Sequence, residues 1–209
     1  QGVEYALVAH WRKIGTIKKH EAAPVLTPVD QIFAVSGSCA ATTEDQIATA
    51  EAHGFQIINF DVSTVTQPKR FAAELERVRN ESLIKLSKNY DVLVATARGP
   101  DDLMIKRMEE AVSKTTMNQR AANERLGEAL GKLVSDIRRT TNIKRIAIAG
   151  GDTSGRVLSS VGAQALSAVA PISPGAPLCR LHTNNDAEID GLEMTLKGGQ
   201  MGEPHFFLQ

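Results

Sequence analysis

The stretch IAIAGGDTSG at residues 146–155 organises the rest of this chain. Four apolar residues run directly into a turn of glycines and small polar residues, which is the pattern of a buried strand followed by a tight turn and a helix. Backbone N–H groups at such a turn have no acceptor within the helix and point toward whatever lies above the sheet. The stretch therefore predicts a strand–turn–helix unit with a candidate phosphate site at the turn.

The composition is that of an ordinary globular protein. The chain has 209 residues, of which 42% are hydrophobic, so it can bury a full core. Lys+Arg and Asp+Glu both number 24, and this balance argues against nucleic acid or a membrane surface as a partner. The longest apolar runs have the length of strands, and the N-terminus lacks a signal-peptide pattern. We therefore expect a soluble, cytoplasmic protein.

The cysteines and histidines do not indicate a metal site. Cys39 and Cys179 show no ligand spacing, and the five histidines are scattered along the chain. We expect both cysteines to be small buried residues and predict no protein-held metal centre.

Apolar runs like the opening one alternate with helical patterns along the chain. The runs lie at residues 32–35, 55–60, 91–97 and 144–149, and the helical patterns cover 42–53, 69–88 and 102–140, with a helix of about ten residues expected after Thr153. Thr43 and Gln46 have the spacing of a capping box. This alternation predicts an α/β fold with a mostly parallel sheet covered by helices on both faces. Additional short β-strands near the C-terminus, at 165–169, 178–181 and 192–196, would form an extra sheet or edge strands.

The turns that follow parallel strands lie at one edge of the sheet, so those at residues 36–39, 98–100 and 150–155 are expected to converge. Gly150 and Gly151 would allow close approach to a ligand, while Thr153 supplies a hydroxyl. Asp152 could accept a hydroxyl or hold Mg²⁺ through water. The alternative is a glycine turn capped by Asp or Thr, with no ligand.

Two further turns have similar chemistry. Ser36 and Ser38 place two hydroxyls around a glycine at the end of a strand, where an ordinary capping turn is the alternative. Lys197 precedes Gly198 and Gly199, and lysine is a good partner for phosphate, although a plain surface loop would look the same. Arg98 either reaches the same crevice or is a solvated surface charge.

Four motifs together resemble one known family. VSGSC at 35–39 with a following threonine and Gln46, AGGDTSG at 149–155, PGAP at 174–177 and LKGG at 196–199 have the order and spacing of the four-carbon acid sugar kinase family. This family was formerly catalogued as a domain of unknown function, and some members were labelled type III effector proteins. The resemblance extends from about residue 31 to the C-terminus.

The resemblance implies the C-terminal, nucleotide-binding lobe of a two-lobed kinase that uses ATP and Mg²⁺ to phosphorylate threonate, erythronate or 3-oxo-tetronate. Residues 1–30 would then be the end of a missing N-terminal lobe and a linker, and 31–209 the nucleotide-binding domain. The helical pattern at 3–12 and the prolines Pro24 and Pro28 fit this division. Because the sugar-acid site would lie in the missing lobe, we expect this chain to be inactive alone.

The resemblance also assigns nucleotide contacts to this chain. They fall on Ser36 or Ser38, on Gly150, Gly151, Asp152 and Thr153, and on Gly199. It assigns no catalytic base. The family's Lys-Ser/Pro-Gly-Asn-Phe-Gly loop is KGGQMG at 197–202 here, so methionine replaces the aromatic residue and glutamine replaces the asparagine. A non-catalytic or effector-type module and a non-kinase enzyme that binds a phosphorylated metabolite therefore stay open as alternatives, as does a homo-oligomer.

Overall fold

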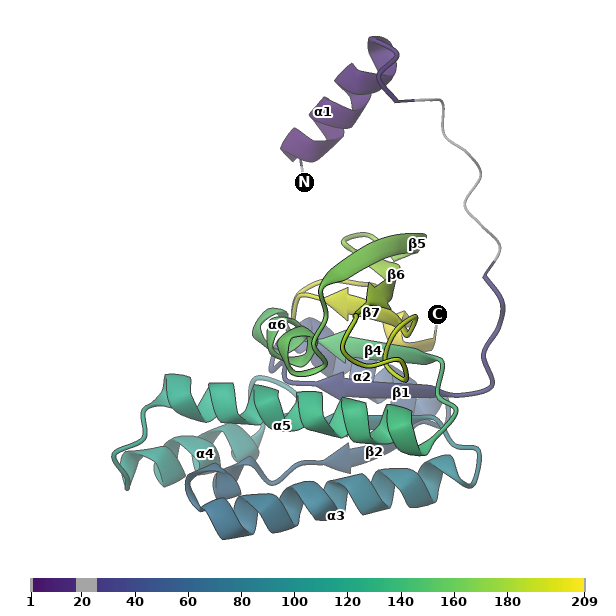
Figure 1. Ribbon diagram of the computed structural model, residues 1–209. Helices are drawn as coiled ribbons and strands as arrows, with labels where there is room; N and C mark the ends of the chain where they lie inside the picture. Colours follow the sequence, from purple (N-terminus) through teal and green to yellow (C-terminus); the bar gives the residue numbers. More distant parts are fainter. Residues whose placement is uncertain (1, 18–25, 209) are drawn as a thin grey trace.

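The computed structural model describes residues 2–17 and 26–208. The first helix, α1 (Gly2–Lys13), forms where the sequence predicts it, and none of its described residues is buried. Figure 1 shows α1 apart from the rest of the chain. The predicted linker residue Pro24 lies outside the described residues, and Pro28 lies in a stretch without regular structure.

A seven-stranded sheet confirms the predicted fold class. Its strands lie in the order β2-β3-β1-β4-β7-β6-β5. The first four strands and β7 are parallel neighbours, and β6 and β5 are antiparallel. The late strands therefore extend the main sheet and do not form a separate one. The strand bounds are β1 Ile32–Ser36, β2 Gln56–Asn59, β3 Val92–Ala95, β4 Arg145–Ala149, β5 Ala165–Ser173, β6 Ala176–His182 and β7 Glu193–Lys197.

The helices follow the predicted pattern with two differences. The region 102–140 is two helices, because Asn118 starts a new helix by accepting a hydrogen bond from the Ala121 backbone N–H at 2.8 Å. The helix after β4 begins at Gly151 and so includes Thr153, after which it was expected to begin. The bounds are α2 Ala41–Ala52, α3 Pro68–Leu86, α4 Leu103–Ser113, α5 Gln119–Thr140 and α6 Gly151–Ser160, with 3₁₀ helices η1 Val62–Thr66 and η2 Phe206–Leu208.

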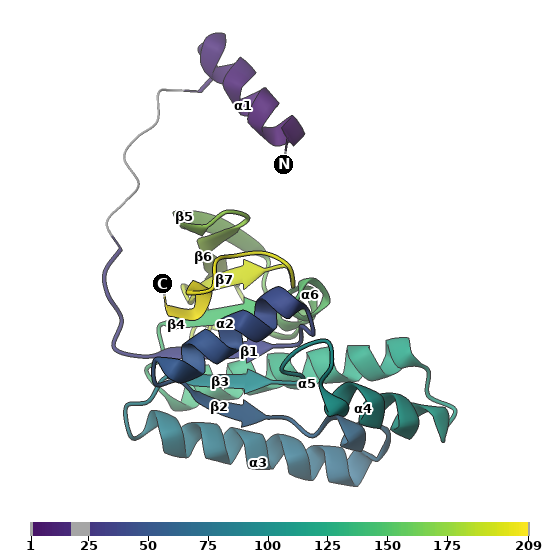
Figure 2. The ribbon, with the colours of Figure 1, turned by 180° about the vertical axis from the view of Figure 1, so that it is seen from behind.

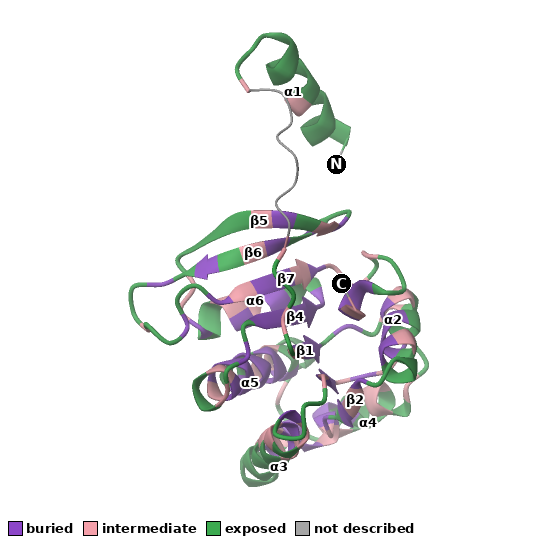
Figure 3. Cartoon of the chain, turned by 90° about the vertical axis from the view of Figure 1, so that its right-hand side faces the viewer, coloured by how far each residue is buried: buried purple, intermediate pink, exposed green. Residues whose placement is uncertain are grey.

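Alternate side chains of the central strands build two cores. Large residues such as Val35 and Ile148 face the helices α3, α5 and α6, whereas alanines such as Ala34 and Ala147 face α2 and η2. Figures 2 and 3 show α2 and α5 on opposite sides of the sheet. Because successive residues of a strand point to opposite faces, this pattern explains why the predicted strands are apolar throughout.

The order of the strands reverses between β1 and β4. The chain leaves β1 into α2 on one face of the sheet and leaves β4 into α6 on the other. A crevice at the carboxyl ends of these two strands follows from this topology, and it is where open α/β sheets bind ligands.

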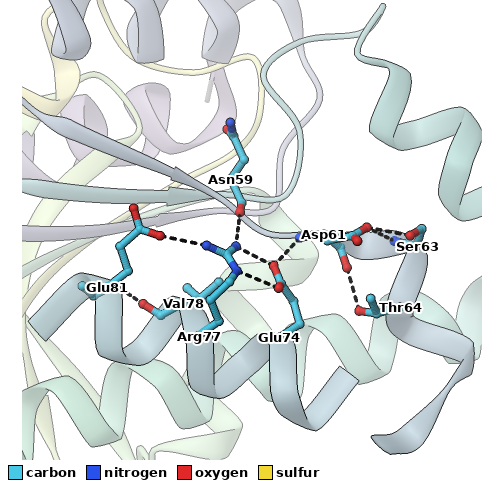
Figure 4. A network of polar contacts seen from close by, with 9 residues as sticks. Asn59, Asp61, Ser63, Thr64, Glu74, Arg77, Val78 and Glu81 are labelled. Atoms are coloured by element: carbon cyan, nitrogen blue, oxygen red, sulfur yellow. Dashed lines mark hydrogen bonds and ion pairs between the residues drawn. The ribbon is translucent and has the colours of Figure 1, made fainter. Parts of the chain in front are cut away.

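A polar network fixes the segment after β2 (Figure 4). The Asp61 backbone N–H donates to Glu74 Oε1 at 2.7 Å, and Arg77 of α3 donates to the Asn59 carbonyl oxygen at 2.8 Å. Arg77 also pairs with Glu74, which raises the pKa of its guanidinium. The network holds η1 at the carboxyl edge of the sheet.

The two cysteines are not where the sequence predicts them. Cys39 is exposed and Cys179 is half-buried. Cys39 lies in the turn beyond β1, at the rim of a cavity, and Cys179 lies in β6, close to the end of the sheet. The prediction that both are buried is therefore wrong, because Cys39 lies in a turn that lines the cavity and Cys179 lies in a strand next to the edge of the sheet.

Helices α5 and α6 approach closely at two glycines of α5. A Cβ atom at Gly131 would lie 2.4 Å from Ser160 Cβ, and one at Gly127 would lie 2.7 Å from Arg156 Cβ. Real Cβ atoms do not approach other atoms at such distances, so only glycine permits this packing.

We expect Gly131→Ala to lower the free energy of unfolding by about 1–3 kcal/mol, because the new methyl group overpacks the α5–α6 contact. Gly155→Ala in α6 is the matched control, since its Cβ would meet nothing within 4 Å. It should raise stability by about 0.4–1 kcal/mol, the usual gain for alanine over glycine in a compatible position. Urea unfolding measures both, and equal effects would contradict the close packing.

Candidate functional site

The turns after β1 and β4 touch each other. The Gly37 N–H donates to the Ala149 carbonyl oxygen at 3.0 Å, and a Cβ atom at Gly37 would lie 2.0 Å from Thr153 Oγ1. Gly150 has φ 114°, in a region that favours glycine. Glycines at 37 and 150 are thus required by this contact.

The turn after β7 completes the group. The Gly150 N–H donates to the Lys197 carbonyl oxygen at 2.9 Å. A Cβ atom at Gly199 would lie 2.7 Å from Ser38 Oγ. The structure therefore brings together the predicted residues of three turns that lie far apart in sequence, at residues 36–38, 150–153 and 197–199. We call residues 36–38, 150–153 and 197–199 the three-turn cradle.

The serines of the cradle serve the backbone. Ser36 is fully buried, and its Oγ accepts a hydrogen bond from the Ser38 N–H at 3.4 Å. Ser38 Oγ accepts from the Ala40 N–H at 3.2 Å and lies 2.9 Å from Thr43 Oγ1. Both hydroxyls thus shape the turn after β1.

The start of α6 is left without a side-chain cap. Gly150 is the N-cap residue, and no side chain of the described residues caps the first-turn N–H groups of this helix. Ser154 Oγ instead donates to the Gly150 carbonyl oxygen at 2.8 Å. The alternative of an Asp or Thr cap is wrong, because Asp152 and Thr153 lie inside the helix. The uncapped N-terminus keeps the positive end of the helix dipole available to an anion.

Arg98 does not point to the cradle. Its guanidinium pairs with Glu51 of α2 at 2.9 Å and donates to Asn59 Oδ1 at 3.2 Å. The turn at 98–100 shares the edge of the sheet, and the arginine there is a surface charge.

Thr43 and Gln46 do not form the predicted capping box. The N-cap residue of α2 is Ala40, without a side-chain bond. Thr43 Oγ1 donates to the Gly199 carbonyl oxygen at 2.8 Å, and Gln46 Nε2 donates to the carbonyl oxygens of Met201 and Glu203, both at 3.0 Å. The prediction is wrong because both side chains bond instead to backbone groups more than 150 residues away. Their shared spacing gave no signal of this role.

Lys197 is buried beneath the cradle. Its side chain is only 1% exposed, and Nζ donates to Thr43 Oγ1 at 2.9 Å and to the carbonyl oxygens of Gly199 at 3.2 Å and Gly198 at 3.3 Å. The Phe206 ring lies 5.7 Å from Nζ. Burial lowers the pKa of Lys197 from its ordinary value of 10.5 to about 8, because the ammonium is removed from water.

A cavity of about 990 Å³ opens beside the cradle, between it and the helices α4 and α5. Ligand pockets commonly have volumes of about 300–1,000 Å³. Its walls combine apolar side chains with the glycine turns. Among the lining residues are Gly37, Thr153, Ile105, Met108, Asn123 and Leu130.

Charged residues of α5 and α6 also line this cavity. Arg156 donates to Glu124 Oε1 at 2.5 Å, and Arg120 donates to the same oxygen at 3.2 Å. These two arginines lower the pKa of Glu124. With Asp152 of α6, which also lines the cavity, this wall has two positive and two negative charges, and the guanidinium N–H groups of the arginines are donors that an anionic ligand could use. No sequence pattern singles out these three residues, because charged residues on a helix surface usually face solvent.

An α/β sheet with glycine turns gathered at its switch point defines a nucleotide-binding class of domain. Residues 33–207 match the family described as the nucleotide-binding C-terminal domain. With the kinases described next, this match shows that the chain belongs to the four-carbon acid sugar kinase family, as its nucleotide-binding C-terminal domain. The family resemblance found in the sequence is thereby confirmed.

The chain is similar to the 3-oxo-isoapionate kinase of Paraburkholderia graminis, with 38% identity over 206 residues. It is 25% identical over 206 residues to the 3-oxo-tetronate kinase of Pseudomonas savastanoi pv. phaseolicola. Each match covers 99% of this chain and 44% of the relative, so the chain spans less than half the length of these kinases.

A crystal structure of a Haemophilus influenzae protein has the same fold, with a TM-score of 0.72 and 18% identity over 94% of this chain and 43% of that one.

Within residues 2–17 and 26–208, none of the helices has the length and apolar character needed to cross a membrane.

We expect Gly37→Ala to lower the free energy of unfolding by about 1–3 kcal/mol, since its methyl group would collide with Thr153 Oγ1. Adding Thr153→Ala removes that oxygen and should recover part of the loss, giving a coupling of about 1 kcal/mol. Gly151→Ala is the control, because its Cβ would meet nothing within 4 Å. Strictly additive effects in urea unfolding would show that the two turns do not touch.

The buried lysine should also give stability a characteristic pH dependence. Because the pKa of Lys197 falls from 10.5 to about 8 on folding, the unfolded chain binds more protons between these values, and stability rises with pH there. The free energy of unfolding of the wild type minus that of Lys197→Met should rise on the order of 1–3 kcal/mol from pH 7 to 10. A difference independent of pH would contradict this burial.

Proposed function

We propose that this chain binds ATP·Mg²⁺ as the nucleotide-binding lobe of a kinase for sugar acids of the 3-oxo-tetronate or 3-oxo-isoapionate type. The observation that carries the proposal is the three-turn cradle, in which glycines at 37, 150 and 199 leave no room for side chains. Such glycine turns at a strand end and a helix N-terminus are suited to holding phosphate through backbone N–H groups.

We assign the phosphates of the nucleotide to the cradle and its base and ribose to the cavity. The uncapped start of α6 and the turns after β1 and β7 suit the phosphates, which are the anionic part. The adjoining cavity, with apolar residues such as Met108 and Leu130 and the amide of Asn123, suits the base and ribose. Arg156 and Arg120 lie on the same wall, where they pair with Glu124, and their remaining N–H groups are suited to donate to a polyphosphate.

Asp152 is the residue we assign to Mg²⁺. It is exposed in the first turn of α6, beside Gly151. Magnesium bound to nucleotides takes one or two carboxylates and keeps several waters, so one aspartate fits this requirement. In the described part of the chain, no group of three or more His, Cys, Asp and Glu residues could hold a metal by itself. The metal would neutralise phosphate charge during transfer.

The substrate assignment rests on the relatives named as kinases of 3-oxo-isoapionate and 3-oxo-tetronate. Phosphoryl transfer depends mainly on positioning and on charge stabilisation, and this chain supplies both for the nucleotide. We assign the sugar-acid site to a second lobe, which corresponds to the part of these relatives outside the match. The chain alone should therefore bind nucleotide without turning it over.

Gly151→Leu tests the proposal. Its side chain would project into open space in the free protein, because a Cβ at Gly151 meets nothing within 4 Å, yet it would occupy the place of the phosphates. We expect the Kd for ATP·Mg²⁺ in isothermal titration calorimetry to rise at least about tenfold, since the backbone could no longer approach the anion.

Gly2→Leu is the matched control, the same exchange near the start of α1, where a Cβ also meets nothing within 4 Å. It should bind like the wild type. Unchanged affinity of a folded Gly151→Leu variant, or no binding of ATP·Mg²⁺ to the wild type, would overturn the proposal.

A further inference from the structure

We propose that Lys197 is a positioning residue, which holds the carbonyl oxygens of Gly198 and Gly199 inward so that the N–H groups of Gly199 and Gln200 face the phosphates. The inference rests on the proposed function of this site and deepens it. It also gives Lys197 a role different from the direct phosphate contact expected from the sequence, because the ammonium acts through the backbone.

The hydrogen bonds of Nζ set this arrangement, together with the Met201 N–H, which donates to the Gly198 carbonyl oxygen at 3.1 Å. Nζ donates to the carbonyl oxygens of Gly198 at 3.3 Å and Gly199 at 3.2 Å. Thr43 Oγ1 accepts from Nζ at 2.9 Å and donates to the Gly199 carbonyl oxygen at 2.8 Å. An ammonium has three protons to donate, and these three acceptors use all of them.

The direction of the amides follows from the direction of the carbonyls. The described peptide bonds are all trans, so the C=O and the N–H of one peptide point in opposite directions. The carbonyl oxygens of Gly198 and Gly199 point toward Lys197, and the N–H groups of Gly199 and Gln200 therefore point away from it. Neither N–H has an acceptor among residues 2–17 and 26–208. Two adjacent free amides form a concave anion site.

The rest of the loop is held just as firmly. Gln46, which is fully buried, donates to the carbonyl oxygens of Met201 and Glu203. Gly199 packs against Ser38, where a Cβ atom would lie 2.7 Å from Oγ. The two free amides are thus fixed beside the turns after β1 and β4, where the proposed phosphates lie. The side chains of Thr43, Gln46 and Lys197 thus fix the KGGQMG loop, which lacks the aromatic residue of the family's loop.

The burial of Lys197 is costly for a purely structural residue. The side chain is 1% exposed, and no carboxylate in the described part of the chain is hydrogen-bonded to it. Burial of an ammonium without a negative partner is unfavourable. A phosphate chain above the loop would supply the missing negative charge, which explains why a lysine occupies this position.

Lys197→Met tests the inference, with Lys85→Met as the matched control. Lys85 lies in α3 and donates to Gln56 Oε1. The control variant therefore also loses a lysine hydrogen bond, but at a place far from the cradle. We expect the Kd for ATP·Mg²⁺ to rise about tenfold to a hundredfold in Lys197→Met, as expected for losing hydrogen bonds to a charged group. Binding of adenosine, which has no phosphates, should stay within about twofold, and Lys85→Met should bind both like the wild type.

A second measurement needs neither a variant nor a nucleotide. In ¹⁵N NMR spectra of the free wild type, the amide signals of Gly199 and Gln200 should titrate with a midpoint near pH 8, because their peptides depend on the protonated ammonium. The groups that face Nζ, Thr43 and Phe206, do not titrate in this range. The charged residues of the neighbouring segments are Glu44, Asp45, Glu203 and His205, all exposed and none bonded to Lys197.

The same titration should appear in binding. The affinity of the wild type for ATP·Mg²⁺ should fall as the pH rises through about 8, and the affinity of Lys197→Met should not show this step. If Lys197→Met does not fold, Thr43→Val replaces it and should weaken ATP·Mg²⁺ in the same direction, because it removes one acceptor of Nζ and one donor to Gly199.

The outcomes separate the inference from the proposed function. A wild type that does not bind ATP·Mg²⁺ overturns the proposed function, and the amide titration then decides on the role of Lys197 by itself. Amide signals of Gly199 and Gln200 that do not change between pH 7 and 9.5 overturn the positioning role. Equal loss of ATP and adenosine binding in Lys197→Met would also overturn it, because a general disturbance would not discriminate phosphate.

Discussion

The contact between Gly37 and Thr153 is the constraint on which the site depends. A methyl group at position 37 would lie 2.0 Å from Thr153 Oγ1. The turns after β1 and β4 can therefore meet only because residue 37 is glycine. Parallel pairing of β1 with β4 aligns their carboxyl ends, and α2 and α6 leave on opposite faces. The crevice of an open α/β sheet is therefore formed here by backbone.

The sequence predicted the architecture because local patterns determine it. The apolar runs that become β1, β3 and β4 are buried on both faces, and turns with glycine end β1 and β4, so the place of these turns at one edge followed from the parallel topology. The place of β7 next to β4 could not be predicted, because it depends on pairing across more than 40 residues. The predicted cap at Thr43 was wrong for a related reason. Threonine side chains commonly bond to nearby backbone at the start of a helix, whereas the actual partner of Thr43, Gly199, is 156 residues away.

Polar groups of the site are organised in two layers. The outer layer is backbone at residues 37, 150 and 199, where glycines allow close approach. The inner layer consists of buried side chains: Thr43 and Lys197 donate to the Gly199 carbonyl oxygen, Ser38 Oγ lies 2.9 Å from Thr43 Oγ1, and Gln46 donates to the carbonyl oxygens of Met201 and Glu203. Preorganised donors of this kind need no rearrangement when an anion arrives, and a fixed cradle is what phosphoryl transfer requires of a nucleotide-binding lobe.

The central claim is that three turns, distant in sequence, bind one phosphate chain. Backbone amide shifts of the wild type during titration with ATP·Mg²⁺ test it most directly. We expect the largest changes to occur together, at one Kd, on Gly37 and Ser38, on residues 150–153, and on Gly199 and Gln200. Changes confined to one turn, or changes that lie outside all three, would contradict it.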